Sequence, residues 1–269
     1  MNPLPPLVKW SGSKKSQATE IVKLFPDKIG TYYEPFLGSG AILGTLSPKV
    51  AVCGDICTPL IGIFNTVKNN PDKISVGYKQ RWDKLQKKGY TYYYEVRDSF
   101  NGSKSPEDLL FLSRTCVNGL IRFNKNGDFN NSLHHSRKGI NPETLARVIK
   151  KWSLVIHDYD FSSKDYAELT KNAKPGDFIY LDPPYLNTKG RYFGGFDMER
   201  FYTYLRELNK RKIKYALSFD GIRGDKTYVA ELPKDLYRRH VYLHSGNSTF
   251  NKVQNGKVEK VFESLYLNY

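Results

Sequence analysis

The residues with the most definite chemistry form the turn Asp182-Pro183-Pro184-Tyr185, which follows the apolar segment 178–181. The two prolines have no backbone N–H groups and fix their φ angles, so carbonyl oxygens and the Asp182 carboxylate can face one pocket without competing donors. Such a pocket accepts hydrogen bonds from an exocyclic amine, while Tyr185 offers a face on which a base can stack. We interpret the turn as a site that activates an –NH₂ group; the alternative is a rigid strand-to-loop turn with a surface tyrosine.

A glycine-rich segment, residues 34–40, follows a short predicted strand and precedes a predicted helix. Its glycines let the backbone approach a ligand closely. Asp55 ends the next predicted strand, 15 residues after Gly40, and an acidic residue in such a position binds ribose hydroxyls in Rossmann-like sites. The order of these features favours an adenosyl cofactor over a purely structural turn. The cluster Lys-Trp-Ser-Gly-Ser-Lys at 9–14 is either part of the same site or a frayed, solvated chain end.

The elements that must position these residues alternate between short apolar strands and helices. This alternation implies a largely parallel sheet with helices on both faces. The middle of the chain has weak strand signals, whereas Ser105-Pro106 and Asn141-Pro142 predict capped helix starts. The sequence therefore predicts an α/β domain interrupted by a mostly helical insertion. Strands are expected at 31–34, 50–53, 154–157, 178–181, 214–219, 239–243 and 261–267, and helices at 14–24, 58–69 and 198–210.

Positive charge is concentrated in that insertion. The 269-residue chain has a formal net charge of +15, and residues 66–150 hold 16 basic and 8 acidic residues, which is more than half of the excess. An acidic polymer is the natural partner, and nucleic acid is favoured over a membrane because no basic amphipathic anchor helix stands out. We therefore predict a catalytic domain made of 1–65 plus 151–269 and an insertion, 66–150, that contacts nucleic acid.

The composition excludes several classes of protein. Hydrophobic residues make up 39% of the chain, which is enough for a core, so the chain is not disordered as a whole. No apolar segment approaches the roughly 20 residues that a membrane span needs, and no signal-peptide pattern opens the sequence. Three cysteines do not suit a disulfide framework and are typical of a reducing cytoplasm. No metal is expected, since Cys53 and Cys57 have no histidine pair nearby.

Taken in order, these motifs resemble the Dam-like DNA adenine-N6 methyltransferases of the α order. The resemblance covers almost the whole chain: the 9–14 cluster, the Glu-Pro-Phe-Leu-Gly-Ser-Gly loop at 34–40, Asp55, the basic insertion and the Asp-Pro-Pro-Tyr turn at 182–185. Residues 118–130 are similar to the target-recognition hairpin of this family. The chain continues with Asn-Ser-Leu-His where the family often has Val-Pro-Phe-Gly, so the resemblance does not define the recognised base sequence.

The resemblance implies a Rossmann-like, S-adenosylmethionine-dependent methyltransferase fold whose insertion recognises the DNA target. S-Adenosylmethionine would be bound by Trp10, Lys14, Phe36, Gly38, Gly40, Asp55, Ile56 and Asp182. The target adenine would be held by the catalytic residues Asp182, Pro183, Pro184 and Tyr185. Double-stranded DNA would be contacted by Asn118, Leu120, Arg122, Asn124, Lys125, Asn130 and Ser132. The fork of Arg122 matches two acceptors of a guanine in the major groove; the alternatives are a phosphate contact and a surface ion pair.

On this interpretation the protein transfers a methyl group from S-adenosylmethionine to the N6 amine of an adenine that is flipped out of a short duplex recognition sequence. It is expected in the cytoplasm, associated with the nucleoid through DNA, as a monomer or weak dimer, and any cognate restriction endonuclease would act separately. The alternatives are an NAD-linked Rossmann oxidoreductase, which leaves the Pro-Pro turn unexplained, and an amino methyltransferase acting on cytosine N4 or RNA. A non-enzymatic DNA-binding module would explain only the charge.

Overall fold

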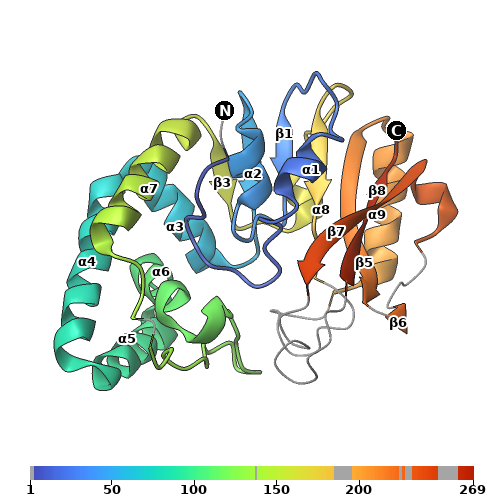
Figure 1. The fold of residues 1–269 in the computed structure, drawn as a ribbon. Helices are drawn as coiled ribbons and strands as arrows, with labels where there is room; N and C mark the ends of the chain where they lie inside the picture. Colours follow the sequence, from blue (N-terminus) through green and yellow to red (C-terminus); the bar gives the residue numbers. More distant parts are fainter. Residues whose placement is uncertain (1–2, 137, 185–195, 224–225, 228–231, 248–259) are drawn as a thin grey trace.

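The computed structural model describes residues 3–136, 138–184, 196–223, 226–227, 232–247 and 260–269. In this part of the chain, eight strands form one sheet in the order β3-β2-β1-β4-β5-β8-β7, with β6 paired to β5 (Figure 1). Strands β3, β2, β1, β4 and β5 are parallel neighbours, whereas β8 runs antiparallel to both β5 and β7. The strands are β1 (Tyr32–Glu34), β2 (Ala51–Gly54), β3 (Asp160–Ser162), β4 (Phe178–Leu181), β5 (Lys214–Arg223), β6 (Lys226–Thr227), β7 (Arg239–Asn247) and β8 (Lys260–Leu267).

Successive side chains of the strands point into two separate hydrophobic cores. Tyr32 and Phe178 belong to the core on one face of the sheet, and their neighbours Tyr33 and Ile179 belong to the core on the other. Both faces are therefore covered by helices, as the alternation of strands and helices predicts. The first core includes residues of α1 (Ala18–Val22), α2 (Ala41–Leu46), α3 (Thr58–Asn69) and α7 (Pro142–Ile156); the second includes residues of α8 (Tyr166–Leu169), α9 (Met198–Lys210) and η2 (Lys234–Leu236).

Helices α4 (Pro71–Lys88), α5 (Tyr90–Ser103) and α6 (Pro106–Thr115) gather at the β3 end of the sheet, beside α3 and α7 (Figure 1). A short 3₁₀ helix, η1 (Val117–Gly119), follows α6. The prediction of helices in the middle of the chain is confirmed. Residues 66 and 150 lie inside α3 and α7, so these two helices lead the chain into and out of the predicted insertion.

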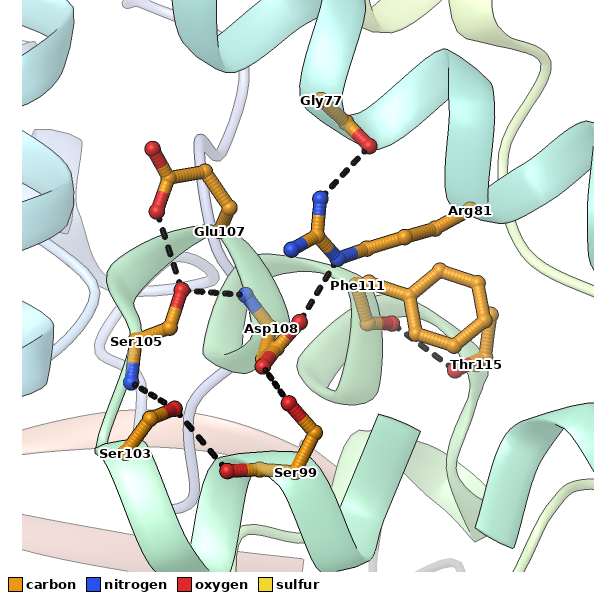
Figure 2. A network of polar contacts seen from close by, with 9 residues as sticks. All are labelled: Gly77, Arg81, Ser99, Ser103, Ser105, Glu107, Asp108, Phe111 and Thr115. Carbon is orange, nitrogen blue, oxygen red and sulfur yellow. Dashed lines mark hydrogen bonds and ion pairs between the residues drawn. The ribbon is translucent and has the colours of Figure 1, made fainter. Parts of the chain in front are cut away.

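A buried carboxylate holds α4, α5 and α6 together, as Figure 2 shows. Asp108 on α6 is 3% exposed and accepts hydrogen bonds from Arg81 Nε on α4 (2.7 Å) and Ser99 Oγ on α5 (3.0 Å). Arg81 also donates to the Gly77 carbonyl (2.9 Å). Because a buried charge is costly unless it is paired and hydrogen-bonded, this network fixes the relative positions of the three helices.

The predicted helix starts are confirmed, since the Ser105 hydroxyl accepts a hydrogen bond from Asp108 N and the Asn141 side chain accepts from Glu143 N and Thr144 N. The six other predicted strands form, but the strand predicted at 154–157 is wrong: these residues end α7, and Leu154 is 68% exposed. The true strand there is β3, six residues later. The helix predicted at 14–24 is shorter than expected.

The N-terminal segment is packed against α2 and α7, so the frayed-end alternative is wrong. Leu7 and Val8 are buried, Leu4 N donates to the Gly44 carbonyl (2.9 Å), and Trp152 Nε1 donates to the Pro5 carbonyl (2.8 Å). These contacts hold the residues that follow, 9–14, in a defined position. None of the helices in the described ranges combines the length and apolar character that a bilayer crossing requires.

Candidate active site

A cavity of about 240 Å³ lies where β1, β2 and β4 end. Three sequence motifs meet there: the 9–14 cluster, the glycine-rich loop after β1 and the turn that starts at Asp182 after β4; Asp55, after β2, also lines it. Parallel strands direct their carboxyl ends to one edge of the sheet, where ligands of open α/β folds bind. The predicted amine-accepting carboxylate and the predicted cofactor loop therefore line the same cavity.

The glycines of the loop are required by its geometry. Gly38 and Gly40 have φ angles of +49° and +67°, a region that side chains disfavour. A Cβ on Gly38 would lie 3.0 Å from Trp10 Cδ1, and one on Gly40 would lie 3.1 Å from the rings of Phe64 and Trp152. The indole of Trp10 thus packs directly on the loop, which joins the N-terminal cluster to the cavity wall.

Asp55 is fixed by backbone donors. Its Oδ2 accepts from Gly38 N (3.1 Å) and its Oδ1 accepts from Cys57 N (3.0 Å). Burial raises the pKa of this carboxyl above its ordinary value, and the two hydrogen bonds oppose that effect. Each oxygen keeps a further acceptor position, which suits a pair of ligand hydroxyls. The adjacent Ile56 lines the cavity with its side chain 59% exposed, so it offers an apolar surface to a ligand.

Lys14 holds the carboxylate of Asp182 from one side. Its Nζ lies 2.7 Å from Oδ1 and 2.9 Å from Oδ2, and it also donates to the Gly12 carbonyl (3.2 Å). The Lys14 side chain is 4% exposed and that of Asp182 is 19% exposed. A carboxylate has about four acceptor positions, so the Lys14 contacts leave room for an amine donor. Pro183 and Pro184 also line the cavity, while Tyr185 lies outside the described residues.

Glu34 is a buried acid in the wall of the cavity. It is 2% exposed, and its Oε2 accepts a hydrogen bond from the Tyr32 hydroxyl (2.8 Å). Burial raises the pKa of Glu34 to about 8; the Tyr32 hydrogen bond lowers it, and the nearby negative charge of Asp182 raises it further. The side chain is therefore mostly neutral at pH 7.

The cavity is acidic in a strongly basic protein. With Glu34 neutral, its described charged lining comprises two basic side chains and four carboxylates. A cavity with this excess of carboxylates attracts a cation and disfavours a ligand with two phosphates, such as NAD. The basic residues are Lys14 and Arg200, and the acidic residues are Asp55, Asp165, Asp182 and Asp197.

The sequence prediction omitted one side of the cavity. Asp165 and Tyr166 line it after β3, and Arg200 reaches it from α9. The guanidinium of Arg200 forms a bidentate pair with Asp165 (2.7 and 3.0 Å) and lies 5.1 Å from the centre of the Tyr166 ring. The sequence places a strand at 154–157, six residues before β3. The loop that follows β3 and carries Asp165 and Tyr166 is therefore not predicted as part of the site. Other lining residues outside the predicted set include Ser11, Ser13, Ser39, Ile121, Phe123 and Phe196.

The predicted recognition hairpin has two chemically different faces. From residue 118 to 124 exposure alternates: the even-numbered residues are exposed and the odd-numbered ones are buried. Ile121 and Phe123, on the buried face, line the active-site cavity. Arg122 and Asn130 face each other across the hairpin, with Nε of Arg122 donating to Asn130 Oδ1 (3.0 Å). The predicted DNA contacts Asn118, Leu120, Arg122, Asn124, Lys125 and Ser132 are exposed, and Asn130 is half-buried.

Strands β3, β2, β1, β4 and β5 run parallel, β8 runs antiparallel between β5 and β7, and the cavity lies where the strand order reverses between β1 and β4. This arrangement is that of a Rossmann-like α/β protein with a ligand site at its topological switch point. The model of the D12 class N6 adenine-specific DNA methyltransferases matches residues 10–250. The chain belongs to this family. It is an enzyme, and its reaction is the methylation of adenine at specific sites in DNA.

Three curated relatives illustrate this membership. The type II methyltransferase M.MjaIII of Methanocaldococcus jannaschii is 30% identical over 79% of this chain and 83% of its own length. The DNA adenine methylase of Haemophilus influenzae is 33% identical over 67% of this chain and 63% of its own length. The type II methyltransferase M.CviBI of Paramecium bursaria Chlorella virus NC1A is 24% identical over 90% of this chain and 94% of its own length.

Proposed function

We propose that the cavity binds S-adenosylmethionine and the target adenine side by side, and that the exposed face of the 118–130 hairpin selects the DNA site. The observation that carries this proposal is the position of the Asp182 carboxylate, held by Lys14 on the same cavity that the glycine loop and Asp55 line. Two substrates of one transfer reaction must meet in one place, and effective alignment of the reacting groups lowers the barrier strongly.

The donor side of the proposal rests on Asp55, the glycine loop and the acidic lining. Asp55 would accept hydrogen bonds from the ribose hydroxyls with the acceptor positions that Gly38 N and Cys57 N leave open. Phe36 and Ile56 would form the apolar wall, together with Trp10. Gly40 would keep the loop that carries Gly38 in its turn, packed against Phe64 and Trp152. S-Adenosylmethionine is a cation and would supply an already activated methyl group on its sulfonium sulfur, so the excess of carboxylates favours it over NAD.

The acceptor side rests on the Asp-Pro-Pro turn. Asp182 and the carbonyl of Pro183 would each accept a hydrogen bond from the N6 amine of an adenine extruded from the duplex, an extrusion that costs a few kcal/mol. These bonds keep the nitrogen lone pair available for in-line attack and stabilise the positive charge that develops on the amine. Lys14 would hold the carboxylate of Asp182 in the orientation that this interaction needs. Pro184 keeps the turn rigid.

For the DNA, we propose that residues 66–150 form the target-recognition insertion and that residues 1–65 and 151–269 form the catalytic domain. The net positive charge of the insertion would attract the phosphate backbone, and Arg122 would read a guanine. The enzyme would act on DNA in the cytoplasm, as a monomer or weak dimer. Any cognate restriction endonuclease would act separately, in keeping with the type II methyltransferases among its relatives.

The proposal is tested by mapping methylated bases in a host that lacks DNA methylation. Cells that express the wild-type enzyme should carry N6-methyladenine at one short sequence, read by single-molecule sequencing. Asp182→Ala should lower the methyl-transfer rate by about 10²–10³-fold, because it removes an acceptor placed for the transition state. Methyl transfer by the purified variant is measured with labelled donor and duplex DNA.

A matched control removes a carboxylate far from the cavity. Asp158, whose side chain is 74% exposed, pairs with His157 at the surface, so Asp158→Ala should keep wild-type activity. Unchanged methyl transfer by Asp182→Ala would remove the proposed role of the turn. Methylation of cytosine N4 instead of adenine in the wild-type map would reassign the amine that the turn binds.

A further inference from the structure

Two tyrosines at the start of α5, the exposed Tyr90 and the half-buried Tyr94, form an aromatic surface beside the 118–130 hairpin. Tyr90 is 65% exposed, which is unusual for so large a ring, and its centre lies 4.6 Å from that of Tyr94. The guanidinium of Arg97, one turn further along α5, lies 4.4 Å from the centre of the Tyr94 ring. The three side chains therefore support one another in a fixed arrangement at the surface. The neighbouring Tyr92 and Tyr93 are buried and pack against Phe111.

Helix α5 is joined to the hairpin along its whole length. The Tyr93 hydroxyl donates to the Asn131 carbonyl (2.9 Å), Asn101 makes two hydrogen bonds with the backbone of Phe129, and Lys104 donates to the Gly127 carbonyl (3.0 Å). Burial raises the pKa of the Tyr94 phenol, but hydrogen bonds with Ser132 and Tyr90 and the charge of Arg97 lower it below its ordinary value. The tyrosine pair is thus continuous with the exposed side of the hairpin at Ser132.

Arg97 is the basic side chain that contacts the pair directly, through the Tyr94 ring. Lys84 and Lys88 lie over the ring of Tyr92, on another side of α5. Glu95 contacts Lys88 (3.5 Å), and Asp98 contacts Arg97 (3.3 Å), both at the surface where such pairs are weak. We call Tyr90, Tyr94 and Arg97 the tyrosine patch. A charged, hydroxyl-bearing surface that extends a DNA-reading hairpin fits a phosphate backbone better than an apolar protein partner.

We propose that the tyrosine patch binds the phosphate backbone of the duplex outside the recognised bases, and so sets the affinity for flanking DNA without setting sequence preference. The proposal rests on the proposed function, because it assumes that the neighbouring hairpin contacts the recognition sequence. Tyrosine hydroxyls and arginines commonly bind phosphate oxygens, and such contacts position a protein on DNA without reading bases. The fixed ring arrangement lowers the entropy that Tyr90 loses on binding.

The test compares two duplexes with the same recognition sequence, identified by methylation mapping: one that ends next to the site and one with long flanks on both sides. Tyr90→Ala should lower kcat/KM on the long duplex by about fivefold to tenfold, the worth of a typical hydrogen bond, and leave the short duplex unchanged. Arg97→Gln should reduce the slope of log K against log salt by about 1 on the long duplex only. Tyr242→Ala, which removes a 50% exposed tyrosine on β7, is the matched control and should change neither.

The outcomes separate this inference from the proposed function. If the wild type does not methylate DNA, the proposed function fails. If the wild type methylates its site but Tyr90→Ala behaves like Tyr242→Ala on the long duplex, only the tyrosine patch is refuted. An equal loss on both duplexes would show that Tyr90 supports the hairpin structure instead. A change in sedimentation without a change in DNA binding would identify a second copy of the chain as the occupant and overturn the inference.

Discussion

At the scale of single residues, Glu34 controls how the stability of the protein depends on pH. Its pKa is about 8 in the folded protein and near the ordinary 4.5 when the chain is unfolded. The folded state therefore holds an additional proton between these values, and its stability falls as pH rises through this window. The full effect is on the order of 5 kcal/mol. A buried carboxyl of this kind is tolerated because the Tyr32 hydroxyl satisfies one of its oxygens.

Replacing this carboxyl should remove that part of the pH dependence. We expect the free energy of unfolding of Glu34→Gln, relative to wild type, to increase steadily from pH 5 to pH 8, because the amide cannot ionise and can still accept from Tyr32. Urea unfolding at each pH measures the difference. Glu20→Gln, which changes a side chain 60% exposed on α1, should run parallel to wild type. A constant difference between Glu34→Gln and wild type across the whole range would contradict the raised pKa.

At the scale of elements, the Asp108 network determines whether the insertion keeps its shape (Figure 2). Asp108→Ala should lower the free energy of unfolding by about 3 kcal/mol, because it leaves Arg81 without its buried partner and Ser99 without its acceptor. The change is measured by urea unfolding at constant pH.

The control for this prediction is an ion pair at the surface of α4. Lys79 and Asp83 are 2.6 Å apart with side chains 59% and 41% exposed, so Asp83→Ala should cost no more than about 0.5 kcal/mol. Equal losses for Asp83→Ala and Asp108→Ala would show that burial of the network contributes nothing. A loss confined to Asp108→Ala would support the network as the link between α4, α5 and α6.

The sequence predicts most elements correctly where a local signal is strong. The Asn141 cap predicts the start of α7, and Phe178–Leu181 forms β4 with the predicted bounds. The error at 154–157 has a clear cause: Leu-Val-Ile is apolar enough for a buried strand, but these residues continue the helical period of Val148, Ile149 and Trp152, which pack on the core. Residues 154–156 are helical because they continue the helix that starts at Asn141 and because that helix packs on the core.

The same reasoning explains which parts of the site could be predicted. Asp182, Asp55 and the glycine loop sit in motifs whose spacing is set by the strands they follow, so the sequence indicates that they meet. Arg200 could not be predicted, because its contact with Asp165 joins residues that only the sheet order brings together. The sequence predicts that Lys14 binds the cofactor. Its direct contact with Asp182 could not be predicted, because that contact depends on how the N-terminal segment folds.

At the scale of the whole molecule, charge is divided between two surfaces of opposite sign. The chain carries +15 overall, most of it in the insertion, yet the described lining of the cavity has more carboxylates than basic groups. A uniformly basic protein would repel a cationic donor while it attracted DNA. With the proposed function, this division would let one chain bind an anionic polymer outside and a cation inside. Residues 121 and 123 of the hairpin line the cavity and so connect the two surfaces.

Ligand binding should therefore stabilise the whole fold, since the cavity is lined by the N-terminal segment, three strand ends and the insertion. S-Adenosylhomocysteine at about 100 times its Kd should add about 2.7 kcal/mol to the free energy of unfolding and raise Tm by about 5–10 °C, measured by differential scanning fluorimetry. NAD at the same concentration should leave Tm unchanged, because two phosphates would enter an acidic cavity. With Asp55→Ala, a tenfold weaker Kd would reduce the gain to about 1.4 kcal/mol at the same ligand concentration. Equal stabilisation by NAD and S-adenosylhomocysteine would contradict a cavity that selects an adenosyl ligand without phosphates.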